Sequence, residues 1–266
     1  MTPPLDTTAG PWLARRFAPA GPPRLQGMAA AGAAVYAVPG RYCVTQIIEG
    51  PTSLVLVDVG STADIIRLAR MVDWLGKPVA WVVPSHLHFD HVMGLEAAAS
   101  RFDTDIAVGR RAADLIRRRR RQRLPANLTA RLWMRVWLQQ GLPGVYPRDL
   151  PRGLRFILPW LPKTLDPAPA RVLDDGDGLP GFAGWQVLDS PGHADEAICL
   201  FHRRSGILVA GDTIINFEGG EWNRLVTDEA DFAATRRRLR DLAVRAVLCG
   251  HGPPISDPAV LARLFG

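Results

Sequence analysis

Three histidines and an aspartate fall within six positions, directly after a short apolar run. Residues 80–83 read Ala-Trp-Val-Val and end at Pro84-Ser85, and residues 86–91 then read His-Leu-His-Phe-Asp-His. An apolar run of this length, closed by a turn signal, predicts a buried strand. Such a strand would carry three imidazoles and a carboxylate out of the edge of a sheet. Because the whole chain has only six histidines, a chance cluster is the weaker interpretation.

The donor atoms of this stretch suit zinc, iron or manganese better than calcium or magnesium. In an extended loop, residues i and i+2 point the same way, so His86 and His88 can bind one ion. Asp90 and His91 are displaced from them and can serve a second ion. The stretch therefore predicts part of a dinuclear metal site.

Further metal-type side chains follow apolar runs elsewhere, each at the end of a predicted strand. They are Asp58, His193, Asp212 and His251. Ligands gather at the carboxyl edge of the sheet in layered α/β folds, so we expect these side chains to meet the 86–91 cluster. The sixth histidine, His202, lies beside Arg203 at a hairpin-like end and is interpreted as a surface or structural residue.

Strand-like and helix-like stretches alternate along most of the chain, which predicts an α/β architecture. The strand-like stretches are 33–38, 42–48, 53–58, 80–83, 105–108, 184–189, 197–202, 207–210 and 246–249. Helical spacing is expected over 62–75, from His91 onward, and over 228–242. We expect residues 1–27 to form a loose N-terminal arm and residues 28–266 to form a single domain.

Residues 110–165 break this alternation. They begin with a basic run that includes Arg117 to Arg121 and continue with tryptophans, leucines and prolines. We predict a basic helix or helix pair, then an irregular, aromatic-lined segment that can lie over the site as a lid. The arginines are interpreted either as a solvated helix face or as a contact for nucleic acid, an anionic lipid surface or an acidic substrate.

Composition limits where such a chain can work. No apolar stretch reaches the roughly 18 residues of a membrane helix, and residues 1–27 lack the order of a secretory signal. We therefore expect a cytoplasmic protein. The three cysteines, Cys43, Cys199 and Cys249, lie within apolar runs and are predicted to be buried, reduced thiols.

The histidines and aspartates are sufficient for two ions. The predicted ligand sets are His86, His88 and His193 for one ion and Asp90, His91 and His251 for the other. Asp212 is expected to bridge the ions and, with Asp90, to take part in catalysis. Asp58 is expected to accept a hydrogen bond from a ligand imidazole. Two ions can share a hydroxide formed near neutral pH, which would attack a carbonyl or phosphoryl centre.

Together these motifs resemble those of the metallo-β-lactamase superfamily. They are His-x-His-x-Asp-His at 86–91, Pro-Gly-His at 191–193, Gly-Asp at 211–212, Gly-His-Gly at 250–252 and Asp58-x-Gly60. The resemblance covers about residues 30–256. It implies an αββα sandwich, in which two β-sheets pack between helices and a dinuclear site lies along one edge.

Asp90 and Asp212, with no cysteine in a ligand position, resemble the glyoxalase II and lactonase type rather than the true zinc β-lactamases. The stretch Ser-His-Leu-His-Phe-Asp-His is most similar to the N-acyl homoserine lactonases and related esterases. That resemblance implies cleavage of a lactone, ester or thioester, with two zinc ions expected and iron or manganese as alternatives. Lactonases of this type use a tyrosine near the leaving group, and Tyr146 is the candidate here. Two features depart from the pattern: only about 15 residues follow His251, so no helical glutathione-binding region is expected, and Met93-Gly94 replaces a Gly-Gly pair.

The leading hypothesis is a hydrolase of a small molecule with an apolar acyl part, and two other classes of reaction are possible. The alternative is a phosphodiesterase or nuclease, resembling the tRNA 3′-processing endonucleases, with the arginines at 117–121 holding phosphates. A third class is an iron-dependent persulfide dioxygenase or the diiron domain of an oxygen reductase. Nucleic acid is the less favoured partner, whereas peripheral membrane contact through the arginines and a homodimer are further expectations.

Overall fold

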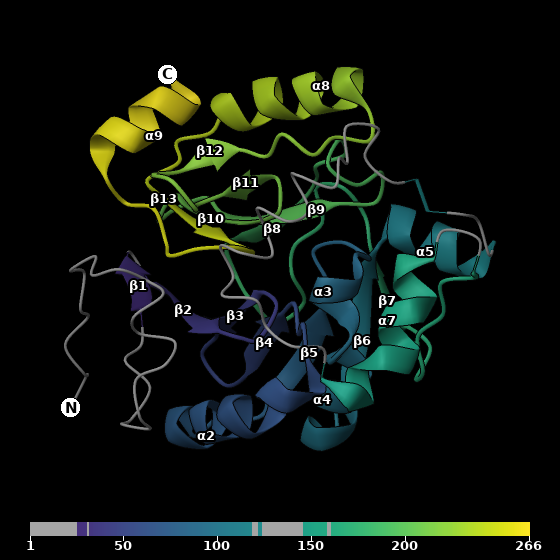
Figure 1. Cartoon of the computed structure of the whole chain (residues 1–266). Helices are drawn as coiled ribbons and strands as arrows, with labels where there is room; N and C mark the ends of the chain where they lie inside the picture. The colour runs from purple at the N-terminus through teal and green to yellow at the C-terminus, as the bar shows by residue number, and fades with distance from the viewer. Residues whose placement is uncertain (1–25, 31, 119–121, 124–145, 159–160) are drawn as a thin grey trace.

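Four layers of secondary structure, arranged helices–sheet–sheet–helices, make up the part of the chain that the computed structural model describes (Figure 1). That part comprises residues 26–30, 32–118, 122–123, 146–158 and 161–266. The arrangement confirms the predicted αββα sandwich. Every helix in these ranges is too short or too polar to cross a membrane.

The first sheet has seven strands that neighbour one another in chain order. They are β1 (Gln26–Ala30), β2 (Ala33–Pro39), β3 (Val44–Glu49), β4 (Leu54–Val57), β5 (Val79–Val83), β6 (Asp105–Gly109) and β7 (Arg171–Leu173). Strands β1 to β4 are antiparallel, and β4 to β7 are parallel. Helices α2 (Ile65–Leu75) and α4 (Leu95–Phe102) make the first two parallel crossovers. The ends of β4 and β5 therefore meet at one edge, where Asp58 and the 86–91 stretch follow.

The second sheet has the strand order β13-β10-β9-β8. Its strands are β8 (Trp185–Asp189), β9 (Ile198–His202), β10 (Ile207–Gly211) and β13 (Ala246–Cys249), and a ribbon of β11 (Ile214–Ile215) and β12 (Glu221–Trp222) lies beside it. Helices α8 (Glu229–Arg240) and α9 (Pro258–Phe265) cover its outer face (Figure 1). His193, Asp212 and His251 follow β8, β10 and β13, as the sequence predicts.

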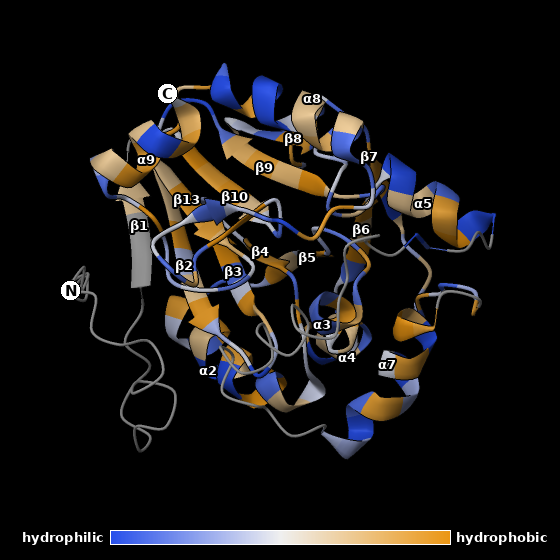
Figure 2. Ribbon diagram, turned by 45° about the horizontal axis from the view of Figure 1, so that its top comes forward, coloured by the Kyte–Doolittle hydropathy of each residue, from blue (hydrophilic) through white to orange (hydrophobic). Residues whose placement is uncertain are grey.

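Alternating side chains on the strands build separate cores on the two faces of each sheet. On β4, Leu54 and Leu56 pack toward the helices, whereas Val55 and Val57 pack between the sheets. Figure 2 shows the apolar residues concentrated on the strands and hydrophilic residues on the outward sides of the helices. This alternation fixes the register, so the strand ends deliver their polar side chains to one place.

The helix expected from His91 onward begins earlier and is divided in two. Helix α3 (Phe89–Val92) starts inside the ligand stretch, and α4 begins only at Leu95. Gly94 lies between the two helices, and a side chain is excluded there because its first carbon would lie 2.5 Å from the Ser61 carbonyl oxygen. Asp90 and His91 therefore project from a helical turn, while His86 and His88 precede it.

The basic segment contains the predicted basic helix, α5 (Arg110–Arg117). The expectation of irregular chain after it is wrong for Leu150–Ile157, which forms helix α7 after a 3-10 turn at Pro147–Asp149. Tertiary contacts select this helix, since Arg152 and Arg155 pair with Glu96 of α4 and Lys163 binds its last carbonyls. Several residues assigned to the arginine run and the lid, including Arg119, Trp133, Trp137 and Trp160, lie outside the described residues, so the lid stays a prediction.

Candidate metal centre

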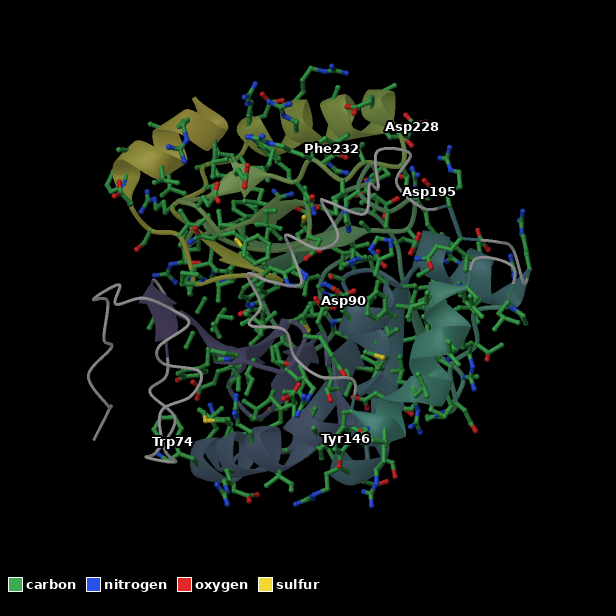
Figure 3. The ribbon with its side chains drawn as sticks, in the orientation of Figure 1. Trp74, Asp90, Tyr146, Asp195, Asp228 and Phe232 are labelled. Atoms are coloured by element: carbon green, nitrogen blue, oxygen red, sulfur yellow. The ribbon has the colours of Figure 1, made fainter. Side chains whose placement is uncertain are left out.

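Seven predicted ligands converge at the edge where the ends of strands from both sheets meet. They are His86, His88, Asp90, His91, His193, Asp212 and His251. Figure 3 shows Asp90 between the two sheets, toward the middle of the molecule. Residues 86–91 contribute four of the seven side chains, and the second sheet contributes the other three. The topology therefore brings together groups that lie up to 165 positions apart.

One ligand group consists of His86, His88 and His193, whose ligand atoms lie within 4.8 Å of one another. His88 Nδ1 lies 3.0 Å from His193 Nε2. The other side of His193 is held by the Leu225 carbonyl, which lies 2.7 Å from His193 Nδ1. Because a carbonyl only accepts, Nδ1 carries the proton, and Nε2 is left to bind an ion.

The second group consists of Asp90, His91 and His251. His251 Nε2 lies 3.3 Å from His91 Nε2 and 3.4 Å from an Asp90 carboxylate oxygen. Asp212 reaches both groups: its oxygens lie 3.3 Å from His91 Nε2, 3.2 Å from His251 Nε2 and 3.6 Å from His193 Nε2. This is the position that a bridging carboxylate requires.

The chemistry of the centre fits metal ions better than a self-contained hydrogen-bond network. His86 Nε2 and His88 Nε2 are buried and have no hydrogen-bond partner among the described residues. Buried polar atoms ordinarily have partners. Converging imidazole and carboxylate donors supply what zinc, iron or manganese bind. The residues present therefore fit two divalent ions.

The electrostatics divide the centre into two halves. Burial lowers the pKa of His86 and of His193, and it lowers that of His88 to about 3, so these rings are neutral. Burial opposes charge on His91 and His251 too, but the Asp212 carboxylate overcomes it and raises the pKa of His251 to about 9. Since metals bind neutral imidazole, filling the second group would release protons.

Asp58 supports the centre from behind. Its Oδ2 lies 2.9 Å from His91 Nδ1, and it accepts hydrogen bonds from both the backbone N–H and the hydroxyl of Ser85. The Ser85 hydroxyl in turn lies 3.0 Å from His86 Nδ1. Asp58 adopts a φ of 61°, and aspartate is among the residues that tolerate this conformation. Ser85 was not among the candidate residues, although its place directly before the ligand stretch is a signal.

Two glycines allow the strand ends to approach the ligands closely. A side-chain carbon at Gly250 would lie 2.4 Å from Asp212 Oδ1 and 2.6 Å from His91 Cε1. One at Gly211 would lie 2.5 Å from the Ser85 hydroxyl, and Gly211 also has a φ of 50°. These positions explain the Gly-Asp and Gly-His-Gly motifs as packing requirements of the centre.

An aromatic ring that sequence reasoning missed lies against the second group. Phe217 stacks on His251 with ring centroids 5.7 Å apart and planes inclined by 25°. It lies in the turn between β11 and β12, and the preceding Asn216 N–H donates to the His251 carbonyl. A half-buried apolar surface therefore lies beside the ligands.

Tyr146 is bound to the hairpin that joins β2 and β3. Its backbone N–H donates to the Tyr42 hydroxyl, and the Arg41 guanidinium lies 5.7 Å from its ring centroid. Figure 3 shows Tyr146 apart from Asp90. Its part near a leaving group stays a prediction.

His202 and the cysteines are structural. The His202 ring is buried against Trp185, and its Nδ1 lies 2.8 Å from the Ser205 hydroxyl. It lies at the end of β9, away from the ligand groups. The expectation of buried, reduced thiols is confirmed, because Cys43, Cys199 and Cys249 are all buried and free.

Arginines of the basic segment pair with carboxylates of the protein itself. Three ion pairs join residues far apart in the sequence: Arg110–Asp174, Arg111–Asp189 and Arg123–Asp195. Arg117 pairs with Asp114 on its own helix. These contacts neutralise part of the basic run. They favour a structural interpretation of those arginines over a phosphate contact.

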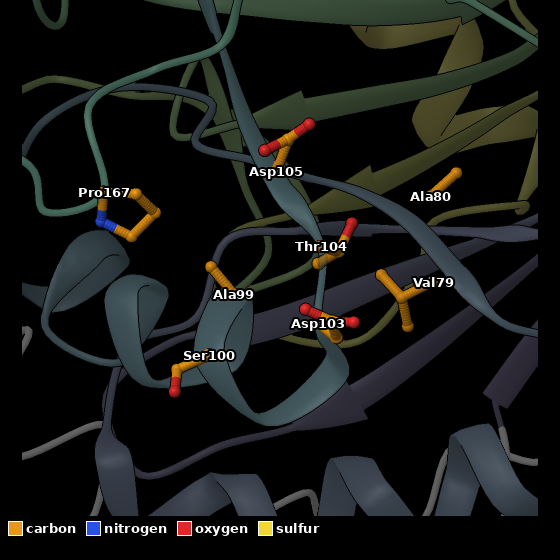
Figure 4. A pocket seen from close by; sticks show the side chains of 8 residues that line it. All are labelled: Val79, Ala80, Ala99, Ser100, Asp103, Thr104, Asp105 and Pro167. Atoms are coloured by element: carbon orange, nitrogen blue, oxygen red, sulfur yellow. The ribbon is translucent and has the colours of Figure 1, made fainter.

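A surface hollow at the opposite end of β5 and β6 is separate from the metal centre (Figure 4). Its lining includes Val79, Ala80, Asp103, Asp105 and Pro167, and it contains neither histidine nor cysteine. Because the ligands follow the carboxyl ends of the strands, this hollow at the amino ends takes no part in the same site.

Comparison with protein-family models establishes the relationship that these motifs suggest. Residues 38–251 match the model described as the metallo-beta-lactamase superfamily. The chain belongs to this superfamily. All seven ligands of the centre fall within the matched residues.

Similar proteins include two from Bacillus subtilis (strain 168). The probable metallo-hydrolase YflN is 23% identical over 230 residues, covering 79% of this chain and 80% of that protein. The probable metallo-hydrolase YqjP is 32% identical over 101 residues, covering 34% of this chain and only 31% of YqjP. The acyl-coenzyme A thioesterase MBLAC2 of Gallus gallus is 26% identical over 217 residues, covering 77% of this chain and 70% of that protein.

Solved structures share the fold. TTHA1623 in a di-iron-bound form has a TM-score of 0.56 at 22% identity, covering 89% of this chain and 98% of that one. The metallo-beta-lactamase family protein TTHA1429 from Thermus thermophilus has a TM-score of 0.55 at 25% identity, covering 88% of this chain and 77% of that one. These comparisons and the cluster identify a metallohydrolase of this superfamily with a histidine–aspartate metal-binding centre.

Proposed function

We propose that the protein cleaves a lactone, ester or thioester with an apolar acyl part, using two divalent ions. The observation that carries the proposal is the pair of donor groups joined by Asp212. A likeness to an acyl-coenzyme A thioesterase supports a carbonyl substrate and, within that class, a thioester. Zinc is the proposed metal, with iron or manganese as alternatives that the same donors accept.

The chain's own residues determine where the reaction takes place. When bound, the two ions supply a water molecule of lowered pKa and stabilise charge on the carbonyl oxygen. Asp58 and Ser85 orient His91 and His86, and the Leu225 carbonyl orients His193. Asp90 is more exposed than Asp212, with 18% against 8% of the side chain accessible, so it is the better placed to exchange a proton with solvent.

Phe217 offers the apolar contact that an acyl or thioester group needs. Its ring covers one face of His251 and stays half-buried, so a substrate at the second ligand group would meet an apolar surface. Burial of that surface on binding would favour an apolar substrate. The phosphate group of a diester gains nothing from such a contact, and Arg117, at the start of the run that would hold phosphates, is paired with Asp114 on its own helix.

The experiment compares three substrates with protein loaded with zinc: a long-chain acyl thioester, a long-chain acyl lactone and an aryl phosphodiester. We expect the thioester or the lactone to be hydrolysed and the diester to be spared. His88→Ala, which removes a ligand, is the control and should abolish hydrolysis. Preferential cleavage of the diester would overturn the carbonyl assignment, and oxygen uptake on a persulfide by iron-loaded protein would favour redox chemistry.

A further inference from the structure

Two consecutive acidic residues after the His193 loop bind the two residues Gln122 and Arg123 of the basic segment. Asp195 accepts two hydrogen bonds from the Arg123 guanidinium, at 2.6 and 2.8 Å. Glu196 Oε1 accepts one from the Gln122 side-chain amide at 2.9 Å. These contacts therefore fasten residues 122–123 to the loop that carries His193.

Glu196 also holds the backbone of the other ligand loop. The same oxygen, Oε1, accepts a hydrogen bond from the Leu87 N–H at 3.1 Å. Leu87 lies between His86 and His88, and its side chain is fully buried in the core. Because a buried N–H requires an acceptor, this carboxylate fixes the chain at the point from which two ligands project.

Burial makes this contact sensitive to substitution. Glu196 is only 2% exposed, and Gln122 is 3% exposed. The Leu87 N–H therefore depends on this buried carboxylate for its hydrogen bond. The contact joins all three histidines of one ligand group, since Glu196 lies three residues after His193 and binds between His86 and His88.

The neighbouring pair, Asp195 and Arg123, also contacts the chain at the start of helix α8. Asp195 also accepts a hydrogen bond from the Thr227 hydroxyl at 3.0 Å, and Arg123 lies 3.7 Å from Asp228 at the start of α8. Figure 3 shows Asp195 and Asp228 on the α8 side of the molecule. Thr227 and Asp228 in turn donate backbone hydrogen bonds to the carbonyl of Gly192, the residue before His193.

We propose that Glu196 is a positioning residue for the ion held by His86, His88 and His193, and that Gln122 and Arg123 clamp the basic segment to it. At least one arginine of the run then serves the metal centre from within the protein. The inference requires the metal centre but no particular substrate. It is therefore tested by metal affinity, which is measured without substrate and stays informative if the proposed reaction is wrong.

The test isolates each ligand group in turn. In an Asp90→Ala background the three-histidine group is retained, and Glu196→Ala should weaken zinc binding there about 10- to 100-fold, as for other residues that orient ligands. Glu196→Gln should restore most of the affinity, because an amide oxygen still accepts from the Leu87 N–H. In a His193→Ala background, where the other group is retained, Glu196→Ala should change zinc affinity less than about twofold.

Affinity is measured by competition with a chromophoric chelator, and far-UV circular dichroism of the metal-free variants confirms that they fold. The proposal is overturned if Glu196→Ala lowers the zinc affinity of both ligand groups equally, or if it leaves the affinity unchanged in the Asp90→Ala background. Arg123→Ala and Gln122→Ala form a second test that leaves Glu196 in place. Each should lower the zinc affinity of the three-histidine group several-fold. Arg117→Ala is the matched control, because within the described residues Arg117 pairs with Asp114 on its own helix and not with the His193 loop. If Arg117→Ala weakens zinc binding as much as Arg123→Ala does, the clamp is wrong.

Discussion

The carboxylate of Asp58 lies 2.9 Å from His91 Nδ1 and orients a histidine of each ligand group. It acts on His91 directly and on His86 through the Ser85 hydroxyl. Protons on the two Nδ1 atoms satisfy this network, which leaves both Nε2 atoms to face the centre. One buried carboxylate thus couples the geometry of the two metal positions.

This relationship predicts different effects for two neighbouring substitutions. Asp58→Asn should weaken binding of both ions by about 10- to 100-fold. Asp58 accepts through both of its oxygens, whereas an amide has one acceptor oxygen, so its N–H₂ would face a donor of either His91 or Ser85. Ser85→Ala should weaken mainly the binding of the ion held by His86. Titration calorimetry with zinc, in the single-group backgrounds described above, separates the two ions. Equal losses at both ions in Ser85→Ala would contradict the directional chain from Asp58 through Ser85.

Gly250 tests how closely the strand end must approach the ligands. In Gly250→Ala the added carbon would meet Asp212 Oδ1 and His91 Cε1 at 2.4 and 2.6 Å, so the bridging carboxylate must shift. We expect at least a tenfold loss of zinc affinity with the fold retained. Gly178→Ala is the matched control, because its nearest contact would be an ordinary 3.9 Å. Zinc content after dialysis distinguishes them, and full zinc content in Gly250→Ala would show that the site adapts.

Lys163 stabilises the end of helix α7. Its ammonium donates hydrogen bonds to the carbonyls of Arg155, Phe156 and Leu158 and has no exposed surface. Burial lowers its pKa to about 8, so it is still charged at pH 7. Lys163→Met should lower the free energy of unfolding by about 2–4 kcal/mol, because one buried and two partly buried carbonyls lose their donor.

The other lysine of the chain provides the control for this change. Lys77 pairs with Glu49 near the surface, and Lys77→Met should cost less than about 1 kcal/mol. Urea unfolding of metal-free protein measures both values. Similar losses in the two variants would show that the capping of α7 contributes no more than a surface ion pair.

Local patterns were sufficient to predict most of the strands and the side chains that converge at their ends. Short apolar runs that end at glycine, proline or serine identified most strands, and the side chains after them identified the centre. The fold confirms this logic because parallel strands place their carboxyl ends at one edge. Helix α9 was missed although Asp257 and Pro258 provide a cap and a first-turn proline, both of them readable signals.

The contacts of the basic segment could not be predicted in the same way. Glu196 binds Leu87 across 109 positions, and Asp195 binds Arg123 across 72. No periodicity relates such residues, so their pairing follows only from the assembled fold. Helix α7 was unpredictable for the same reason. Its ion pairs are with Glu96, which is distant in the sequence, and Lys163, which caps it, lies beyond its last residue.

His202, which lies away from the metal centre, should make the free energy of unfolding depend on pH. Its Nδ1 accepts hydrogen bonds from the Ser205 hydroxyl and the Ser205 N–H, at 2.8 and 3.2 Å, so the folded protein requires a neutral ring. Burial lowers the pKa of His202 below its ordinary value. Below about pH 6.5 the unfolded chain therefore binds a proton that the folded chain refuses.

The stabilisation from His202 is thus complete above about pH 6.5 and decreases as the pH falls. Histidines of the centre titrate as well, so the informative quantity is the difference between wild type and His202→Gln, which has no titrating ring. Urea unfolding of metal-free protein from pH 8 to pH 5 should show the wild type losing stability faster, by up to about 1.4 kcal/mol per pH unit. Parallel curves would mean that the folded protein accepts a proton at His202 and that the Ser205 N–H contact is not maintained.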